Sequence, residues 1–200
     1  MALAARHSMI RKLRAIKRRK RYDDKLRELI LHIANSSEGD ERFGATKLNK
    51  LLFYSDFLAY VYLGKAITKQ EYQRLGEGPA PRRLLPVMEK MKNNEEIVIR
   101  SHQYCGYTQK RAVALREPDL SMFNAKEIAL VDKLIRDFWP YTAREISEKS
   151  HHFLGWQHAK PGEGIPYTVA LVGCRKPTTK ELAHGKKLIP LAKKVLEQGC

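Results

Sequence analysis

Cysteine is scarce in this sequence, and no metal-binding or disulfide pattern is present. The 200 residues include three cysteines, which lie far apart and form no CxxC pair. Scattered thiols of this kind are typical of free intracellular cysteines rather than of a disulfide framework or a thiolate zinc site. His151, His152 and His158 lie close together, but no HExxH motif or carboxylate pair accompanies them. We therefore expect no metal and no other cofactor.

Long apolar runs and the motifs of common enzymes are also missing. No stretch approaches the roughly 20 apolar residues that cross a bilayer, and the N-terminus lacks the features of a secretory signal. The segments GEGPAP and KPGEGIP contain glycine but not the GK[ST] ending of a phosphate loop. A nucleophilic Cys105 would need a base that the sequence does not identify. The sequence therefore predicts a cytoplasmic protein that is not an enzyme and does not insert into membranes.

Acidic residues are absent from the first 21 positions, which hold nine lysines and arginines, in a chain whose formal net charge is +16. Ile10, Leu13 and Ile16 have helical spacing, so this basic arm is either an amphipathic helix or a disordered tail. A run of cations attracts any polyanion, so we expect weak nucleic-acid binding without sequence preference. Arg18 and Arg19 are the candidate contacts of the arm to a partner.

Hydrophobic periodicity predicts a mainly helical chain. Helices are expected at about 24–36, 47–63, 85–93, 125–138 and 143–153. Asp23 and Asp24 stand where a helix start favours negative charge, and Pro86 suits a first helical turn. Two helices open with the spacing of a capping box, Asn124 with Glu127 and Thr142 with Glu145.

A small amount of β-structure is expected beside these helices. Alternating residues predict a hairpin with strands at about 96–101 and 109–116. Residues 66–83 have a short β-like start, and the two glycines and two prolines that follow within six positions are interpreted as a rigid connection rather than an element. Thr178 and Glu181 open a final basic helix that Pro190 interrupts. The expected fold class is mainly α with a small β-hairpin (α+β), in a single compact helical domain.

The segment KLNKLLFYSDFLAYVYLGKAIT, residues 47–68, places charged groups on a helix that is otherwise suited to burial. A buried carboxylate must be paired or hydrogen-bonded, because an uncompensated buried charge costs several kcal/mol. We therefore predict that Asp56 is a structural anchor, which accepts hydrogen bonds from the loop Thr68–Gly78 or from the region of His151. The stems of Lys47 and Lys50 are expected to lie along apolar surface with their ammonium groups in water.

Two binding hypotheses follow from the residues alone. The order helix, helix, connection, helix, hairpin would suit a winged-helix DNA-binding regulator whose cations lie near helix starts: Lys47, Lys50, Arg82 and Arg83. Aromatic residues in the expected loops suit either a protein interface or the core: Tyr72, Tyr104, Tyr107, Trp156 and Tyr167.

Four motifs occur in a recognisable order along residues 24–172. They are a K-L-x-K-L-L-x-[FY]-x-D-F helix, a Y-x-G-x-x-I-T segment with a later tyrosine, a G-P-x-P turn, and a late S-H, W and I-P-Y series. Their residues are Lys47, Leu48, Lys50, Leu51, Leu52, Tyr54, Asp56, Phe57, Tyr62, Gly64, Ile67, Thr68, Tyr72, Gly78, Pro79, Pro81, Ser150, His151, Trp156, Ile165, Pro166 and Tyr167. In these motifs the sequence resembles the Panacea family of SocA-like antitoxin domains.

This resemblance implies an antitoxin without enzymatic activity, which neutralises a cognate protein toxin by direct binding. It also implies a mainly helical scaffold, which we place at 23–175; the charge and helix signals of the sequence place a basic arm at 1–22 before it and a basic C-terminal helix at 176–200 after it. One family member also delivers its toxin to a Clp protease, so a Clp-type protease is a second candidate partner. The residues expected to contact a partner are Lys47, Lys50, Tyr72, Gly78, Pro79, Trp156 and Tyr167, and those expected to hold the motif together are Asp56, Thr68, Ser150 and His151.

Overall fold

The computed structural model describes residues 2–172 together with residues 179, 183 and 190. Its elements follow in the order α1 (Ala2–Ser36), α2 (Ala45–Leu63), β1 (Tyr72–Leu75), β2 (Gly78–Pro81), α3 (Leu84–Asn93), β3 (Ile97–Tyr104), β4 (Tyr107–Ala114), η1 (Leu120–Met122), α4 (Ala125–Phe138), α5 (Ala143–His151), α6 (Leu154–His158), β5 (Gly164–Ile165) and η2 (Tyr167–Leu171). The expected α+β class is confirmed. The helix expected from Thr178 onward lies outside the described residues.

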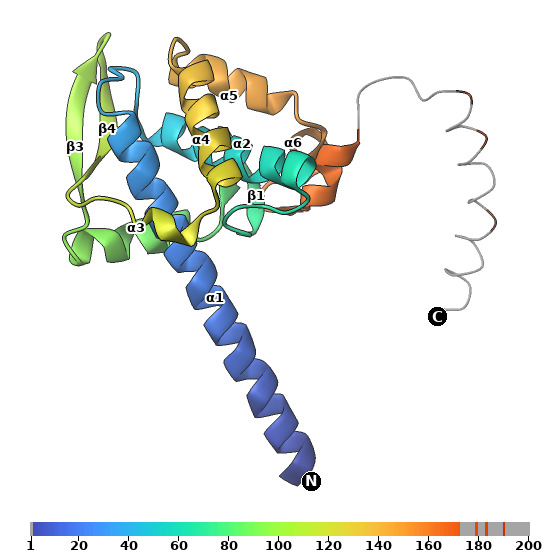
Figure 1. Cartoon of the computed structure of the whole chain (residues 1–200). Coiled ribbons are helices and arrows are strands. Elements are labelled where there is room, and N and C mark those ends of the chain that lie inside the picture. Colours follow the sequence, from blue (N-terminus) through green and yellow to red (C-terminus); the bar gives the residue numbers. More distant parts are fainter. Residues whose placement is uncertain (1, 173–178, 180–182, 184–189, 191–200) are drawn as a thin grey trace.

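Helix α1 is continuous over 35 residues and runs from the basic arm into the core (Figure 1). The prediction that a helix begins at about residue 24 is wrong, since Asp23 and Asp24 lie inside α1, far from its first residue. No proline or glycine interrupts this segment, and alanine, leucine, arginine and lysine are strong helix formers. The part of α1 from Leu26 to Ala34 is largely buried, whereas Leu13 and Ile16 in the arm are exposed.

Helix α2 lies at the centre of the body, where it contacts α1, α4, α5, β2, β4 and η2 (Figure 1). It is apolar on nearly every side, as the sequence predicted for a helix that is surrounded by protein. Gly64 ends it with a φ of 73°, the left-handed conformation of a C-terminal cap. The main core joins α1 to α2 through Leu26, Leu29, Ile30, Ile33, Leu48, Leu51 and Leu52.

Strands β1 and β2 form an antiparallel hairpin that also pairs with β5, in the order β2-β1-β5. The interpretation of the glycine- and proline-rich part, residues 76–81, as a connection without an element is therefore wrong, since it contains β2. The prolines argued against a strand in the prediction. However, β2 lies at the edge of the sheet, where proline, which has no N–H, does not remove a hydrogen bond to a neighbouring strand. This small sheet joins the segment after α2 to Ile165, more than ninety residues later, through the pair Tyr72 and Ile165.

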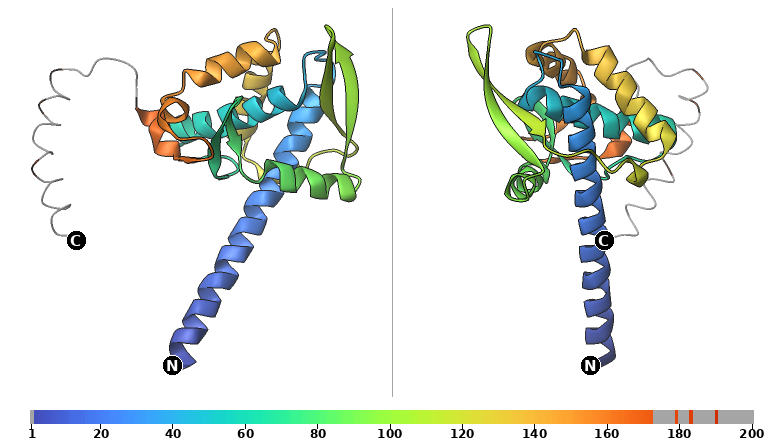
Figure 2. Two further views of the ribbon diagram at one scale, coloured as in Figure 1. Left: turned by 180° about the vertical axis from the view of Figure 1, so that it is seen from behind. Right: turned by 60° about the vertical axis from the view of Figure 1, so that its left-hand side comes forward.

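The second hairpin confirms the prediction for residues 96–116 and stands at one edge of the body (Figure 2). Its strands turn at Cys105 and Gly106, which both have positive φ. Helix α3 precedes it and carries Pro86 in its first turn, as predicted. Helices α4 and α5 begin at the two predicted capping boxes, and both boxes are complete. In the described part of the chain, no helix is both long and apolar enough to span a membrane.

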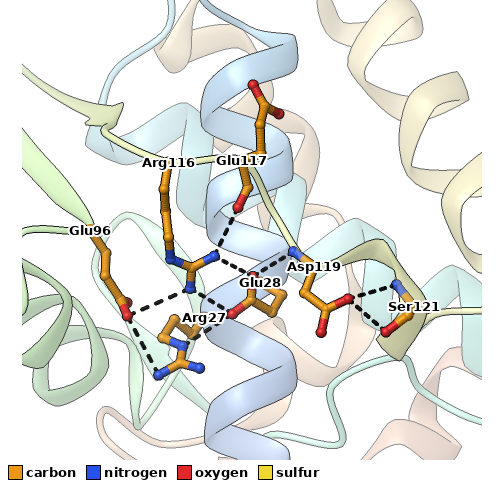
Figure 3. Close-up of polar contacts among 7 residues, drawn as sticks. All are labelled: Arg27, Glu28, Glu96, Arg116, Glu117, Asp119 and Ser121. Carbon is orange, nitrogen blue, oxygen red and sulfur yellow. Dashed lines mark hydrogen bonds and ion pairs between the residues drawn. The ribbon is translucent and has the colours of Figure 1, made fainter.

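A polar cluster joins α1 to the residues just before β3 and just after β4, at the open end of the second hairpin (Figure 3). The buried carboxylate of Glu28 accepts hydrogen bonds from the Arg116 guanidinium at 2.7 and 2.8 Å and from the Asp119 N–H at 2.8 Å. Arg27 and Arg116 also lie 3.6 and 3.5 Å from the Glu96 carboxylate. Burial alone would raise the pKa of Glu28, but the bonds from Arg116 and Asp119 outweigh it and lower that pKa. This cluster sets the direction in which α1 leaves the body.

Candidate functional site

The motif segments meet at the carboxylate of Asp56, which is fully buried on α2. It accepts hydrogen bonds from the Thr68 N–H at 2.7 Å, from the Thr68 hydroxyl, and from the Tyr72 hydroxyl at 3.0 Å. The Tyr167 hydroxyl lies 3.5 Å away. The hydrogen bonds expected from the loop after α2 are therefore present. Among the described residues, no hydrogen bond reaches Asp56 from His151, the other donor region considered.

The electrostatics of Asp56 are set by its burial and by its hydrogen bonds. Burial raises the pKa of its carboxyl, and the hydrogen bonds from Thr68 and Tyr72 oppose that rise without cancelling it. Burial, reinforced by the neighbouring carboxylate, also raises the pKa of the Tyr72 and Tyr167 hydroxyls. Both tyrosines therefore stay neutral and keep a proton to donate. Because Asp56 and Tyr72 are buried, the hydrogen bonds of this cluster hold the segment after α2 against the helix.

A second buried cluster surrounds the ammonium of Lys50, six residues before Asp56 on α2. Its Nζ donates to the carbonyl oxygen of Glu77, which also accepts from the Ser147 hydroxyl at 3.2 Å. Gly78 follows with a φ of +112°, and a Cβ at this position would lie closer than 3.0 Å to both Lys50 Nζ and Ser150 Oγ. Glycine thus allows the turn between β1 and β2 to close against α2 and α5.

Lys47 joins α2 to the segment between α4 and α5. Its Nζ lies 2.5 Å from Asp40 Oδ2 and donates to the carbonyl oxygens of Trp139 and Tyr141 at 3.2 and 2.9 Å. Burial lowers the pKa of Lys47, and the hydrogen bond to Asp40 opposes this shift. The ammonium therefore serves as an internal tie between three segments.

The expectation that the ammonium groups of Lys47 and Lys50 reach water is wrong. Their exposed fractions are 1% and 0%, because α2 is covered on all sides and both stems end at buried oxygen atoms. Neither ammonium can contact a partner directly. Neither can contact a DNA phosphate, although the winged-helix hypothesis requires such a contact. Tyr72, Gly78 and Pro79 are buried as well. These five residues are therefore buried and cannot themselves form an exposed contact surface.

We expect Lys50→Met to raise the free energy of unfolding at pH 7. Burial lowers the pKa of Lys50 to about 8 from 10.5, so the charged form is disfavoured in the folded protein. Between pH 8 and pH 10.5 the Lys50 amine is protonated in the unfolded chain but not in the folded protein. The free energy of unfolding of the wild type therefore rises with pH over this range, by about 3 kcal/mol at most. The Glu77 carbonyl keeps the Ser147 donor in the variant.

Urea unfolding at several pH values measures this effect. The stability gain of Lys50→Met over wild type should be largest below pH 8 and shrink toward pH 10.5, where wild-type Lys50 is already neutral when folded. Lys90→Met, at an exposed position of α3, is the matched control and should show no such trend. A gain that is the same at every pH would contradict the assignment.

A half-exposed aromatic surface lies on β1, at the end of α5 and on α6. The Trp156 indole donates its N–H to the Leu75 carbonyl at 2.8 Å, and the Leu75 side chain is 45% exposed. The Arg74 guanidinium lies 4.6 Å from the centre of the Trp156 ring, and the His151 ring stacks on the same indole at 4.1 Å. We call Arg74, Leu75, His151 and Trp156 the Trp156 surface. Of these, the sequence singled out His151 and Trp156 but missed the two β1 residues, because no strand was expected there.

The remaining predicted contacts lie elsewhere. Tyr167 is half-buried and stacks on Tyr60 at 5.6 Å, so its ring belongs to the cluster around Asp56. Arg18 and Arg19 are exposed on the arm part of α1. The residues described in the structure include no group of three or more histidine, cysteine, aspartate or glutamate side chains that could hold a metal ion.

Comparison with known proteins gives one match. The family model described as antitoxin SocA-like, Panacea domain matches residues 48–157. This range begins at the second residue of the first motif and ends next to Trp156, so it includes Asp56, Lys50 and the Trp156 surface. Comparisons with curated proteins and with solved structures found no match.

Proposed function

Because the chain belongs to the family of SocA-like antitoxins with a Panacea domain, we propose that it neutralises a cognate protein toxin by direct contact. The observation that carries this proposal is the family match over 48–157, which spans the segments that converge on Asp56 and Lys50. A role in binding rather than catalysis also agrees with the burial of the charged residues in this cluster. Delivery of the bound toxin to a Clp-type protease is a further possibility that the resemblance raises.

The Trp156 surface is the proposed contact for the toxin. Tryptophan and arginine are enriched among the residues that dominate binding energy, and the exposed Leu75 beside them adds apolar contact area. The indole is held in place by its hydrogen bond to Leu75 and by stacking on His151, so little side-chain freedom remains to be lost on binding. The Trp156 indole packs on the buried cluster of Phe53, Phe57, Tyr72 and Ile165. Arg18 and Arg19 on the arm are proposed as a second, partner-selecting contact.

We expect Leu75→Asp to abolish toxin neutralisation without unfolding the protein. The side chain is exposed, so the substitution removes apolar contact area and introduces a charge at the interface while leaving the core intact. Leu85→Asp is the matched control, since Leu85 is an exposed leucine on α3, away from this surface. Growth rescue on co-expression with the toxin should fail for the first variant and persist for the second. Equal rescue by both variants would remove the Trp156 surface from the proposal.

The proposed activity itself is tested with the neighbouring reading frame of the gene. That reading frame should be toxic when expressed alone and harmless when expressed together with this chain. A neighbour that is harmless alone would contradict the antitoxin role. In rescued strains, a shortened half-life of the toxin would support delivery to a protease, whereas an unchanged half-life would indicate neutralisation by binding alone.

A further inference from the structure

A strongly cationic pocket lies where the arm part of α1 enters the body. It has a volume of about 430 Å³, lies between α1 and the loop after α2, and includes one carboxylate, that of Glu127, in its wall. Six cationic side chains line it: Lys17, Arg18, Arg21, Lys25, Lys65 and Lys69. Lys25 is paired with Glu127 at 2.9 Å. The other five form no ion pair with a described carboxylate, so the pocket has a large uncompensated positive charge.

The positive charge continues out of the pocket along one face of α1. Arg11, Arg14, Arg18, Arg21 and Lys25 are separated by alternating steps of three and four residues, which places them on a single stripe of the helix. The first four are exposed. The stripe covers about 21 Å of helix and presents a cation about every turn. A ligand that satisfies it must therefore carry several negative charges in a row, unlike a single phosphate ion.

The walls of the pocket favour a nucleic-acid strand over an acidic protein segment. A protein segment needs apolar anchors, but the apolar lining residues Ala66 and Ile67 are only 4% and 2% exposed. Tyr22 is half-buried and supplies an aromatic ring on which a base could stack, with Lys69 Nζ 5.7 Å from the ring centre. The pocket has cations of α1 on one side and Lys65 and Lys69 on the other. This arrangement suits a single strand between them better than the wider double helix.

We infer that this pocket and the stripe on α1 bind the phosphodiester backbone of single-stranded nucleic acid without sequence preference. This site is separate from the Trp156 surface, and it includes Lys65 and Lys69, which lie outside the basic arm. It differs from diffuse attraction by a charged tail because two elements of the fold contribute cations to one defined pocket. Single-stranded RNA and single-stranded DNA share the required chemistry.

The test measures fluorescence anisotropy of a labelled oligouridylate of about 15 nucleotides with the full chain, across a series of salt concentrations. The double variant Lys65→Gln and Lys69→Gln should bind about tenfold more weakly, and the slope of log K against log salt should fall in magnitude by about 1.4, since each lost phosphate contact removes about 0.7. Both lysines are exposed, so the melting temperature should not change.

The matched control is the double variant Lys110→Gln and Lys160→Gln, two exposed lysines on β4 and before β5 with the same loss of charge. It should lose less than about twofold in affinity. An equal loss in both double variants would overturn the inference, because binding would then follow net charge alone. Binding of a matched duplex or of polyglutamate as tightly as the oligouridylate would also overturn it. A preference for the RNA or for the DNA form of the same strand supports the site and identifies its ligand.

Discussion

Replacing Asp56 by alanine will lower the free energy of unfolding by about 3 kcal/mol, because buried donors lose their acceptor. The backbone N–H and the hydroxyl of Thr68 both donate to this carboxylate, and neither has another acceptor among the described residues. The alanine also leaves a cavity beneath the loop after α2. Urea unfolding at pH 7 measures the loss.

The two tyrosines in this cluster are less affected than Thr68. The Tyr72 hydroxyl lies 2.9 Å from the carbonyl oxygen of Leu52, and the Tyr167 hydroxyl lies 2.6 Å from that of Gln70. Each tyrosine therefore keeps an acceptor when the carboxylate is removed.

Thr68→Val removes the Thr68 hydroxyl but keeps the hydrogen bond from the Thr68 N–H to Asp56. We therefore expect this variant to lose about half as much free energy of unfolding as Asp56→Ala.

Asp137→Ala is the control for the alanine substitution. Asp137 is an exposed carboxylate on α4 that pairs with Lys133 at 2.6 Å, and exposed pairs of this kind contribute less than about 1 kcal/mol. A melting temperature of Asp56→Ala equal to that of wild type would contradict the anchoring role.

Gly78→Ala is expected to destabilise the fold by about 3 kcal/mol, through two effects. The φ of +112° is accessible to glycine but strained for alanine, and the added Cβ would displace Lys50 Nζ and Ser150 Oγ. Displacement of Lys50 breaks its hydrogen bond to the Glu77 carbonyl and leaves a buried ammonium without an acceptor. Thermal unfolding followed by circular dichroism measures the shift.

The same turn provides the control for this substitution. Gly76 lies two residues earlier, and a Cβ there would have no neighbour within 4 Å. Gly76→Ala should therefore leave the melting temperature close to that of wild type. If the two alanine variants melted together, the close packing of the turn against α2 and α5 would not be a determinant of stability.

Local signals in the sequence predicted those parts of the fold that local physics determines. The capping boxes at Asn124 and Thr142 were identified correctly because a cap depends on residues three positions apart. The burial of Asp56 and its bonds to the following loop were predicted because a carboxylate on an apolar helix needs donors. The hairpin β3–β4 was predicted from its alternation.

The errors concern features that depend on distant segments. The ammonium groups of Lys47 and Lys50 were expected in water, but oxygen atoms of Asp40 and Glu77, which local spacing does not reveal, lie within reach. Strand β2 was missed because its prolines are tolerated only at a sheet edge, and the position of an edge depends on which strands pair. The pocket beside α1 was missed for the same reason, since Lys65 meets the arm only in the folded chain.

The continuity of α1 has a consequence for the thermodynamics of the arm. Isolated helices are marginal in water because the first turn is costly to nucleate, and neighbouring cations such as Arg14 and Arg18 repel one another. Here the buried C-terminal part of α1, held by Glu28, supplies the nucleus, so the arm only has to propagate a helix that already exists. A polyanion that binds the arm therefore binds a helix that is already formed. It avoids much of the free-energy cost of ordering, about 2 to 5 kcal/mol, that accompanies coupled folding and binding. Its negative charges would also reduce the repulsion between the cations of the arm helix. Ligand binding should therefore protect the arm amides from hydrogen exchange, first those nearest the body and then those farther out.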